Sequence, residues 1–275
     1  MAYFDKYGVE FSDDRRVLVK CPPTLSGTYV IPEGVVMIEE DAFMCCEEIT
    51  SIIVPEGVKR ISDGAFQLCE SLVSVSLPKS IDRIRWSTFN GCKKLSSINL
   101  PEGIDCIEGN AFSCCHGLKT IKIPRSVRRI EENAIYECLG LETVDIPASV
   151  WHIGINFHNC DNLVSINMEE NDGHYCSCDG VLYWRTDTFA NLMKCPARKQ
   201  GSYVVSRGTW GIEMYAFGNC KGLTSISLPD TIARIDETAF FGCTNLREIV
   251  VPSRVMGRIS KLDGLKPLMN KVVVR

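Results

Sequence analysis

The chain has 275 residues, an apolar share of 45% and a formal net charge of −4 at pH 7. That apolar share is ordinary for a globular protein, and the slight negative charge argues against the basic field used to bind nucleic acid. No stretch of about 18 apolar residues occurs, so we expect no membrane insertion. Length alone allows one or two domains.

An internal repeat with a period of 23 residues dominates the sequence. Its clearest copy, residues 101–123, reads PEGIDCIEGNAFSCCHGLKTIKI, and residues 55–77 and 229–251 keep the same positions. The consensus is P-x-x-[VI]-x-x-I-x-x-x-A-F-x-x-C-x-x-L-x-x-[IV]-x-[LIVM]. Each unit of such an array packs on its neighbours, so the repeats share one core and predict a single repeat domain over residues 1–275.

Residues 1–31 precede the first full copy and predict a capping β-hairpin. Two apolar runs, Val9–Phe11 and Val17–Val19, flank the polar segment Ser12–Arg16, which is the pattern of two strands joined by a turn. We expect the hairpin to cover the open end of the array, because an uncovered first turn would expose apolar surface and a sheet edge.

Six repeats follow over residues 32–168. The first five have 23 residues each, and the sixth is one residue shorter. In the sixth, Ile153 and Phe157 are four residues apart where the pattern needs five, and Asn156 stands where alanine is expected.

Residues 169–205 interrupt the repeats and match the N-terminal segment. The matching positions predict an inserted hairpin that resembles the cap, with two extra residues before its Cys-Pro pair: Gly180-Val181 with Gly8-Val9, Cys195-Pro196 with Cys21-Pro22, and Gly201, Tyr203 and Val204 with Gly27, Tyr29 and Val30. This order indicates duplication of a hairpin-plus-repeats block.

Two further repeats occupy residues 206–251, and residues 252–275 form a degenerate C-terminal cap. Val255 and Ile259 keep the repeat spacing there, but no Ala-Phe pair follows them. Residues 271–275 predict a short closing strand whose charged ends discourage edge pairing.

Within one repeat, the last two apolar residues of L-x-x-I-x-L lie two apart and therefore share one face of a strand. In residues 101–123 these are Ile121 and Ile123, and stacking the copies predicts a parallel sheet with one buried face. The proline then ends the strand, because it lacks the donor for the ladder. The V-x-x-I step predicts a second short strand, and Ala-Phe-x-x-Cys a turn whose aromatic rings stack, with Ile135 replacing one of them: Phe43, Phe66, Phe89, Phe112, Phe157, Phe217 and Phe240.

Fifteen cysteines are present, and eight of them fall on one repeat position. A periodic cysteine is best interpreted as a small buried apolar residue. Side chains in such a ladder point in parallel, so free thiols are favoured, which suits a reducing compartment. The first residues carry no signal-peptide pattern, so we expect a cytoplasmic protein on the sequence alone.

The repeat unit resembles the BspA-like leucine-rich repeat family, which it matches eight times, and Asp179–Tyr183 followed by Cys195-Pro196 resembles the companion segment of that family. The resemblance implies a leucine-rich-repeat solenoid, a right-handed curved superhelix of short parallel β-strands with turns or single helical turns. It also implies a surface or secreted protein that binds other proteins or host surfaces. This chain departs from that picture because no export signal or anchor is visible.

The outward positions of the main sheet form two polar rows, which we take as the candidate binding face. Rows of hydroxyls and amides can hydrogen-bond an extended partner, as solenoid surfaces do. The alternative is that such ladders simply suit a solvated, tightly curved sheet face. The ten residues of this candidate face are Ser74, Ser76, Ser97, Asn99, Thr120, Lys122, Thr143, Asp145, Ser165 and Asn167.

The outward row of the second strand is the secondary candidate. It includes Cys106 and His152 as well as Arg60, Arg83, Arg129 and Arg234, with Trp151 and Trp210 just before the strand. One interpretation is a basic stripe for an acidic ligand. The favoured one is ion pairing between rows, such as Arg129 with Glu131 or Glu108, worth roughly 0–1 kcal/mol each. An exposed tryptophan is a hot-spot candidate, although packing against the inserted hairpin is as plausible.

No catalytic, metal or cofactor site is predicted. The segment His174-Tyr175-Cys176-Ser177-Cys178 lacks the usual ligand spacing of a zinc site, and no nucleophile, phosphate-loop or dinucleotide motif occurs. The sequence therefore favours a non-enzymatic interaction scaffold that binds a protein or peptide. The alternative is a surface or secreted adhesin-like protein that binds a host matrix protein or glycan.

Overall fold

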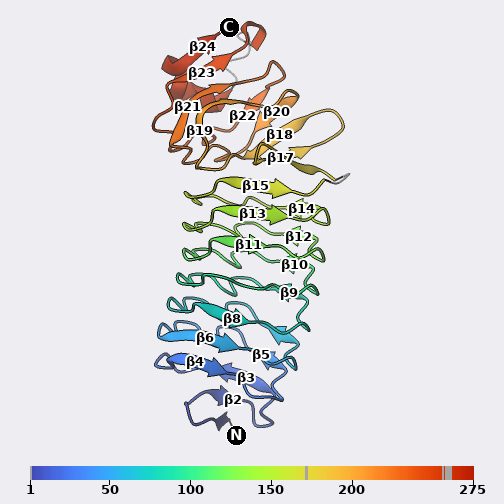
Figure 1. The fold of residues 1–275 in the computed structure, drawn as a ribbon, viewed down its shortest axis with the longest axis vertical. Coiled ribbons are helices and arrows are strands. Elements are labelled where there is room, and N and C mark those ends of the chain that lie inside the picture. Colours follow the sequence, from blue (N-terminus) through green and yellow to red (C-terminus); the bar gives the residue numbers. More distant parts are fainter. Residues whose placement is uncertain (1, 171–172, 256, 258–261) are drawn as a thin grey trace. The chain divides into compact units, whose positions relative to one another are not determined.

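The computed structural model describes residues 2–170, 173–255, 257 and 262–275, so the expected repeat position Ile259 lies outside the described residues. The chain forms two compact units, residues 1–158 (unit 1) and residues 159–275 (unit 2), coloured blue to green and green to red in Figure 1. Both are built from short strands with little helix. The prediction of one domain over 1–275 stays a prediction.

Unit 1 begins with the predicted hairpin. Strands β1 (Tyr3–Phe4), β2 (Glu10–Phe11) and β3 (Val17–Lys20) pair in antiparallel order. Strand β3 then pairs in parallel with β5 (Met37–Ile38), and β5 with β7 (Arg60–Ile61). The hairpin thus supplies the first rung of a parallel ladder, as the capping hypothesis requires.

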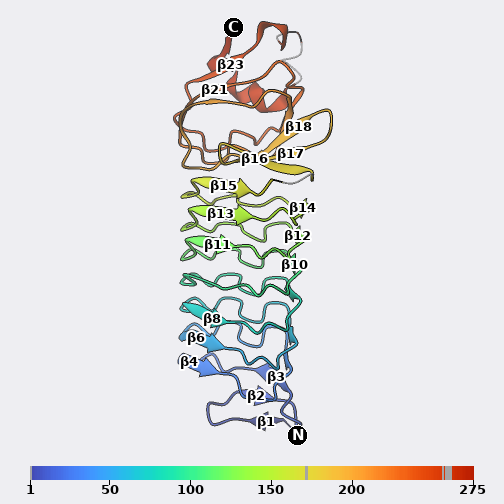
Figure 2. The same cartoon turned by 45° about the vertical axis from the view of Figure 1, so that its right-hand side comes forward.

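Unit 1 contains two ladders of strands, whose labels lie in two columns in Figure 2. The main ladder contains β4 (Gly27–Val30), β6 (Ile49–Ile53) and β8 (Ser74–Ser76), and further along the chain β11 (Thr120–Lys122) and β13 (Thr143–Ile146). The second ladder continues with β9 (Arg83–Ile84), β10 (Cys106–Ile107), β12 (Arg129–Ile130) and β14 (His152–Ile153). The predicted second strand of the repeat is therefore present, with two residues per turn.

The predicted parallel sheet is interrupted at one turn, residues 78–100. The main ladder ends at β8 and resumes at β11, while the second ends at β7 and resumes at β9. Continuing the second ladder would place Arg60 directly beside Arg83, and like charges opposite each other disfavour pairing. Arg83 instead turns toward the following repeat, where it pairs with Glu108 at 3.2 Å.

The core of unit 1 is a column of phenylalanine rings, as predicted. The ring centroids of Phe43, Phe66, Phe89 and Phe112 follow one another at 5.3, 5.4 and 5.4 Å, and all four rings are fully buried. Ile135 continues the column and is also buried. Rings at this spacing add a favourable contact beyond their burial.

The repeat cysteines pack beside this column as free, buried thiols. Several of them donate through Sγ to the backbone carbonyl of the phenylalanine in the preceding turn, for example at 3.1 Å for Cys69, 3.1 Å for Cys92 and 3.2 Å for Cys115. The same carbonyls also accept a backbone N–H within their own turn, as Phe43 does from Cys46 at 3.0 Å. The thiol therefore adds a second, weaker hydrogen bond that links consecutive turns.

The side chain of Asn156 compensates for the residue that the sixth repeat lacks. Its Oδ1 accepts a hydrogen bond from the backbone N–H of Ile135 at 2.9 Å, and its Nδ2 donates to the carbonyl of Glu131 at 2.8 Å. In a complete turn, backbone groups fill these roles, as where the N–H of Phe112 donates to the carbonyl of Ala134. The buried side-chain amide therefore replaces one peptide group.

Unit 2 repeats the topology of the N-terminal block. Strand β15 (Ser165–Met168) is followed by the antiparallel strands β16 (Tyr175–Cys178), β17 (Val181–Arg185) and β18 (Ala190–Lys194), then by the parallel strands β20 (Thr209–Ile212) and β22 (Arg234–Ile235). The predicted inserted hairpin is therefore present and carries one more strand, as the cap does.

The other ladder of unit 2 contains β19 (Gln200–Val204), β21 (Gly222–Ser227), β23 (Glu248–Val251) and β24 (Val272–Val274). Strand β24 is the predicted closing strand. The 3₁₀ helix η2 (Asp263–Lys271) precedes it and was not expected from the sequence. In the described part of the chain, no helix has the length and apolar character needed to cross a bilayer.

Candidate binding faces

The candidate face of unit 1 follows from the alternation of its strands. In β8 and β11 the central residues, Val75 and Ile121, are buried, while the residues on either side point outward. Across β11 and β13, Thr120 pairs in register with Thr143, and Lys122 with Asp145. The outward members in unit 1 are exposed except for Thr143, which is half-buried: Ser74, Ser76, Ser97, Asn99, Thr120, Lys122, Thr143 and Asp145.

Ser97 and Asn99 differ from the prediction in one respect, because they lie in the turn where the main ladder is interrupted and belong to no strand. Asn99 nevertheless lines a shallow depression of about 250 Å³ together with Ser51, Ser74 and Ser76. The hydroxyls of Ser51 and Ser74 are 3.2 Å apart, and the side chain of Ile53, 42% exposed, forms an apolar edge.

The remaining two members, Ser165 and Asn167, lie on β15 in unit 2. The turn of the inserted hairpin covers Ser165: a Cβ placed on Gly180 would come within 3.0 Å of its Cβ, and the N–H of Ile166 donates to the carbonyl of Gly180 at 2.9 Å. Asn167 is exposed. The sequence predicted that all ten residues lie in two outward rows and did not indicate that the hairpin covers Ser165.

Ion pairs connect side chains of the second row. Such pairing is the interpretation that the sequence favoured. Glu131 accepts from Arg129 at 2.7 Å and lies 3.7 Å from the ring of His152. Arg83 pairs with Glu108, and in unit 2 Arg234 pairs with Glu213. The hydrogen bond that Arg83 donates to Glu108 raises the pKa of Arg83 above its usual value, so this guanidinium stays charged and is paired with a neighbouring carboxylate. Arg60 is exposed on β7.

Cys106 lies in the outward row, as expected, but it is not exposed. Its side chain is only 3% exposed, and its Sγ lies 3.9 Å from Arg129 Nη2 and 3.9 Å from Glu131 Oε1. A short side chain in a row of long ones is covered by its neighbours. Burial raises the pKa of the Cys106 thiol.

The tryptophans of the secondary candidate have different surroundings. Trp151 is 57% exposed, with its ring beside His152. The Trp210 ring packs 5.6 Å from Phe189 of the inserted hairpin, and Phe189 lies 5.9 Å from Trp184. Packing against the hairpin therefore accounts for Trp210, whereas Trp151 keeps the exposure that a contact residue needs.

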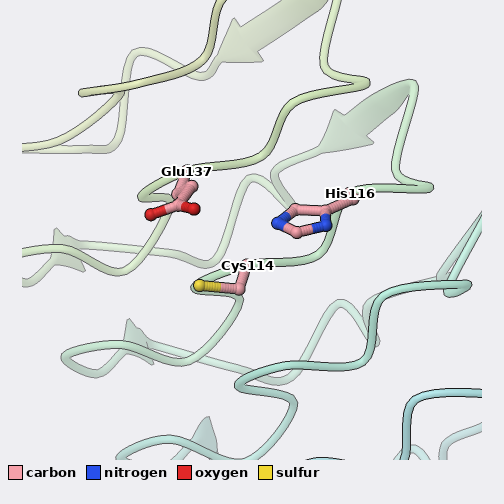
Figure 3. Close-up of side chains that lie close together, drawn as sticks. All are labelled: Cys114, His116 and Glu137. Atoms are coloured by element: carbon pink, nitrogen blue, oxygen red, sulfur yellow. The ribbon is translucent and has the colours of Figure 1, made fainter.

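A side-chain cluster that the sequence interpretation missed lies in unit 1, at Cys114, His116 and Glu137. One donor atom from each residue lies within 4.8 Å of the other two, and all three side chains are partly buried. Figure 3 shows them facing a common space. The signal was present in the sequence: Cys114 and Glu137 are 23 residues apart, so the repeat stacks them in adjacent turns.

The segment that sequence reasoning weighed as a metal site and rejected has other neighbours. Tyr175 is buried, Cys178 is exposed, and His174 lies beside Trp184 with ring centroids 6.4 Å apart. Across the described residues, the Cys114 cluster is the one group of three potential ligands that converges within 4.8 Å.

Comparison with solved structures gives the same architecture. A leucine-rich cell surface protein from Faecalibacterium prausnitzii is 24% identical over 92% of this chain and 89% of that chain, with a TM-score of 0.66. The pneumococcal vaccine antigen PcpA is 21% identical, with a TM-score of 0.76 over 92% of this chain and 71% of its own. A leucine-rich repeat protein from Eubacterium ventriosum is 18% identical, with a TM-score of 0.60 over 97% and 81%. At these identities the likeness concerns the fold.

No curated protein sequence matches the chain. The family model described as the BspA type leucine-rich repeat region does match it, in six copies over residues 36–164 and 208–261. These ranges span the repeats of both units and more than half of the chain. The chain is a β-solenoid of parallel strands that belongs to the BspA-type leucine-rich repeat family.

Proposed function

We propose that this protein is a non-enzymatic scaffold that binds a protein or peptide partner through the outward face of the main ladder in unit 1. The observation that carries the proposal is the strict alternation in β8 and β11, where a buried residue separates two exposed polar ones. Such a face offers regularly spaced hydrogen-bonding groups on a rigid backbone, which is how repeat proteins present binding surfaces.

Within this face, the depression near Asn99 is the expected centre of partner contact. Hydroxyls of Ser51, Ser74 and Ser76 can donate to or accept from a peptide backbone, and Ile53 offers an apolar contact beside them. Adjacent strands of a ladder lie about 4.8 Å apart, so the hydroxyls recur at a spacing that an extended partner lying across the strands can meet.

Absence of enzymatic activity is part of the same proposal. The family is one of repeat scaffolds, and the titratable groups of the second row are engaged in ion pairs with one another. A binding function needs only the surface, which agrees with the polar, well-ordered rows of unit 1.

A second candidate is a surface-displayed or secreted adhesin-like protein, whose partner would be a host matrix protein or glycan. Two similar structures favour it through their names, one a cell surface protein and the other a vaccine antigen. The sequence alone favoured the cytoplasm. Fractionation of the source cells separates the two, because a protein confined to the cytosolic fraction contradicts the adhesin.

The test of the face is a double variant, Thr120→Glu with Lys122→Glu, used as bait with extracts of the source cells and of their surroundings. Both positions are exposed on β11. The matched control, Thr24→Glu with Lys59→Glu, makes the same chemical changes at exposed positions off the strand face. We expect partners captured by the wild type and the control to be lost from the double variant. Equal recovery by all three baits would contradict the proposed face.

A further inference from the structure

The Cys114–His116–Glu137 cluster brings together three different donor types at the junction of two consecutive turns. Cys114 and His116 belong to the turn of residues 101–123, and Glu137 belongs to the next. Their donor atoms converge within 4.8 Å. A thiolate, an imidazole and a carboxylate together are the ligand set that zinc takes in proteins.

The backbone holds this cluster in place. Cys114 and Glu137 occupy the same left-handed position of consecutive turns, with φ of 58° and 53°. The Cys114 N–H donates to the carbonyl of Tyr136 at 2.9 Å, and the His116 N–H donates to the carbonyl of Cys114 at 3.0 Å. Gly140 packs against His116 so closely that a Cβ there would lie 2.3 Å from the His116 carbonyl oxygen. The three side chains therefore start from fixed positions.

A second observation points to a ligand. The Nε2 atom of His116 is buried and has no hydrogen-bond partner in the described part of the chain. Buried ring nitrogens are normally paired with protein groups or water, so an unpaired one needs an explanation. A metal ion at the centre of the cluster would supply the missing partner.

The charges around the cluster are compatible with a cation. Glu137 and Lys93 are the charged groups that act on the Cys114 thiol. Lys93 donates to Glu70 at 2.6 Å, so its charge is compensated within its own pair. Glu137 is left to balance the ion together with the thiolate.

We propose that Cys114, His116 and Glu137 bind a zinc-type divalent metal ion that joins two consecutive turns of unit 1. In a tetrahedral zinc site with bonds of about 2.0–2.3 Å, neighbouring ligand atoms lie roughly 3.3–3.7 Å apart. Side-chain rotations that move the ligand atoms by about 1 Å therefore complete the site. Water fills the fourth position. The Cys114 thiol loses its proton to solvent as the sulfur–metal bond forms.

Cobalt(II) titration of the reduced full-length protein tests the proposal, because cobalt reports thiolate ligation by a charge-transfer absorption. We expect the wild type to saturate this band at one equivalent and zinc to displace it. Cys114→Ser should abolish the band, and His116→Ala and Glu137→Gln should weaken cobalt binding by at least roughly tenfold. Glu137→Gln keeps the size of the side chain, so it separates lost ligation from lost folding, which circular dichroism checks for every variant.

Cys45→Ser is the matched control among the fifteen cysteines. Cys45 occupies the same repeat position, with φ of 62°, and also precedes a repeat cysteine. Its turn carries Glu47 in place of His116, and the next turn carries Leu68 in place of Glu137. Cys45→Ser should therefore leave the band unchanged. A wild type without a one-equivalent thiolate band, a band retained in Cys114→Ser, or a band lost equally in Cys45→Ser would each overturn the assignment.

Discussion

The hairpin block that opens unit 1 and the one inside unit 2 reach the same strand order from sequences that match at few positions. Both have three antiparallel strands followed by two parallel ones. One register shift coincides as well: it falls between Glu10 and Phe11 in the first block and between Leu182 and Tyr183, the equivalent residues, in the second. The two blocks therefore share this bulge along with the strand order, whereas the shift between Ala190 and Asn191 occurs in the second block only.

The blocks differ in how they satisfy one buried tyrosine. Tyr29 and Tyr203 are equivalent, and each ring lies 6.0 Å from the first phenylalanine of its column. The hydroxyl of Tyr29 donates to Asp5 at 2.8 Å, whereas the hydroxyl of Tyr203 pairs with that of Tyr183 at 2.7 Å. Phe11 stands at the position of Tyr183 and has no hydroxyl to offer.

A lysine shows the same contrast. Lys20 donates to the carbonyl of Asp41 at 2.6 Å and stays exposed. Its equivalent, Lys194, is buried and donates to the carbonyls of Tyr215 and Gly218, each at 3.2 Å. Burial lowers the pKa of Lys194 below its usual value. The two blocks thus share one arrangement of strands but bury different polar side chains within it. The strand arrangement is therefore the more constrained of the two.

The largest effect is expected from disrupting the aromatic column, which both blocks share. Phe43→Ala and Phe217→Ala each remove a fully buried ring and should lower the free energy of unfolding by roughly 3–5 kcal/mol. Urea denaturation of both variants measures this. Phe241→Ala is the control, because that ring is 62% exposed. Wild-type stability in either column variant would contradict the packing of that block.

An intermediate effect sharpens the difference between the blocks. Tyr183→Phe removes the partner of the buried Tyr203 hydroxyl and should cost about 1–3 kcal/mol in thermal or urea unfolding. Adding Tyr203→Phe removes the stranded hydroxyl and should recover part of that loss. The first block needs no such pair, because Asp5 serves Tyr29. An unchanged stability in Tyr183→Phe would show that the hydroxyl pair is dispensable.

The smallest effect concerns the ion pairs of the second row. Glu108 accepts from Arg83 and from the Trp86 N–H, and Glu213 accepts from Arg234 and from Asn191 Nδ2. Glu108→Gln and Glu213→Gln keep an acceptor and remove the charge, so each should cost about 0–1 kcal/mol. Salt should shrink the difference from wild type, which unfolding at low and high ionic strength would measure. A loss that salt does not reduce would argue against a charge effect.

Sequence reasoning succeeded where identical residues recur at a fixed spacing. The phenylalanine column, the buried cysteines and both hairpins follow from the repeat, because stacking places equivalent positions next to each other. It failed where side-chain length and neighbouring charges decide. Cys106 is buried because its neighbours are long, and the ladders are interrupted where Arg60 would meet Arg83.

The candidate sites divide in the same way. The alternation of a strand predicts that Thr120 and Lys122 are exposed, and they are. That Gly180 covers Ser165 depends on the path of a turn, which no spacing in the sequence encodes. The Cys114 cluster was detectable by aligning consecutive repeats, but His116 comes from a neighbouring position, and only the fold of the turn brings its ring inward.

The interrupted turn at residues 78–100 has a dynamic consequence. The phenylalanine column runs through it, with Phe89 at 5.4 Å from the ring on each side, but the main ladder has no strand there and β9 does not pair with β7. In a repeat array, stability is a sum of terms between neighbours, so the weakest backbone term marks where local opening begins. We therefore expect the amide hydrogens of Ser97 and Asn99 to exchange with solvent faster than those of β8 and β11. A partner that contacts both the depression at Asn99 and β11 would bridge the interrupted turn and slow that exchange.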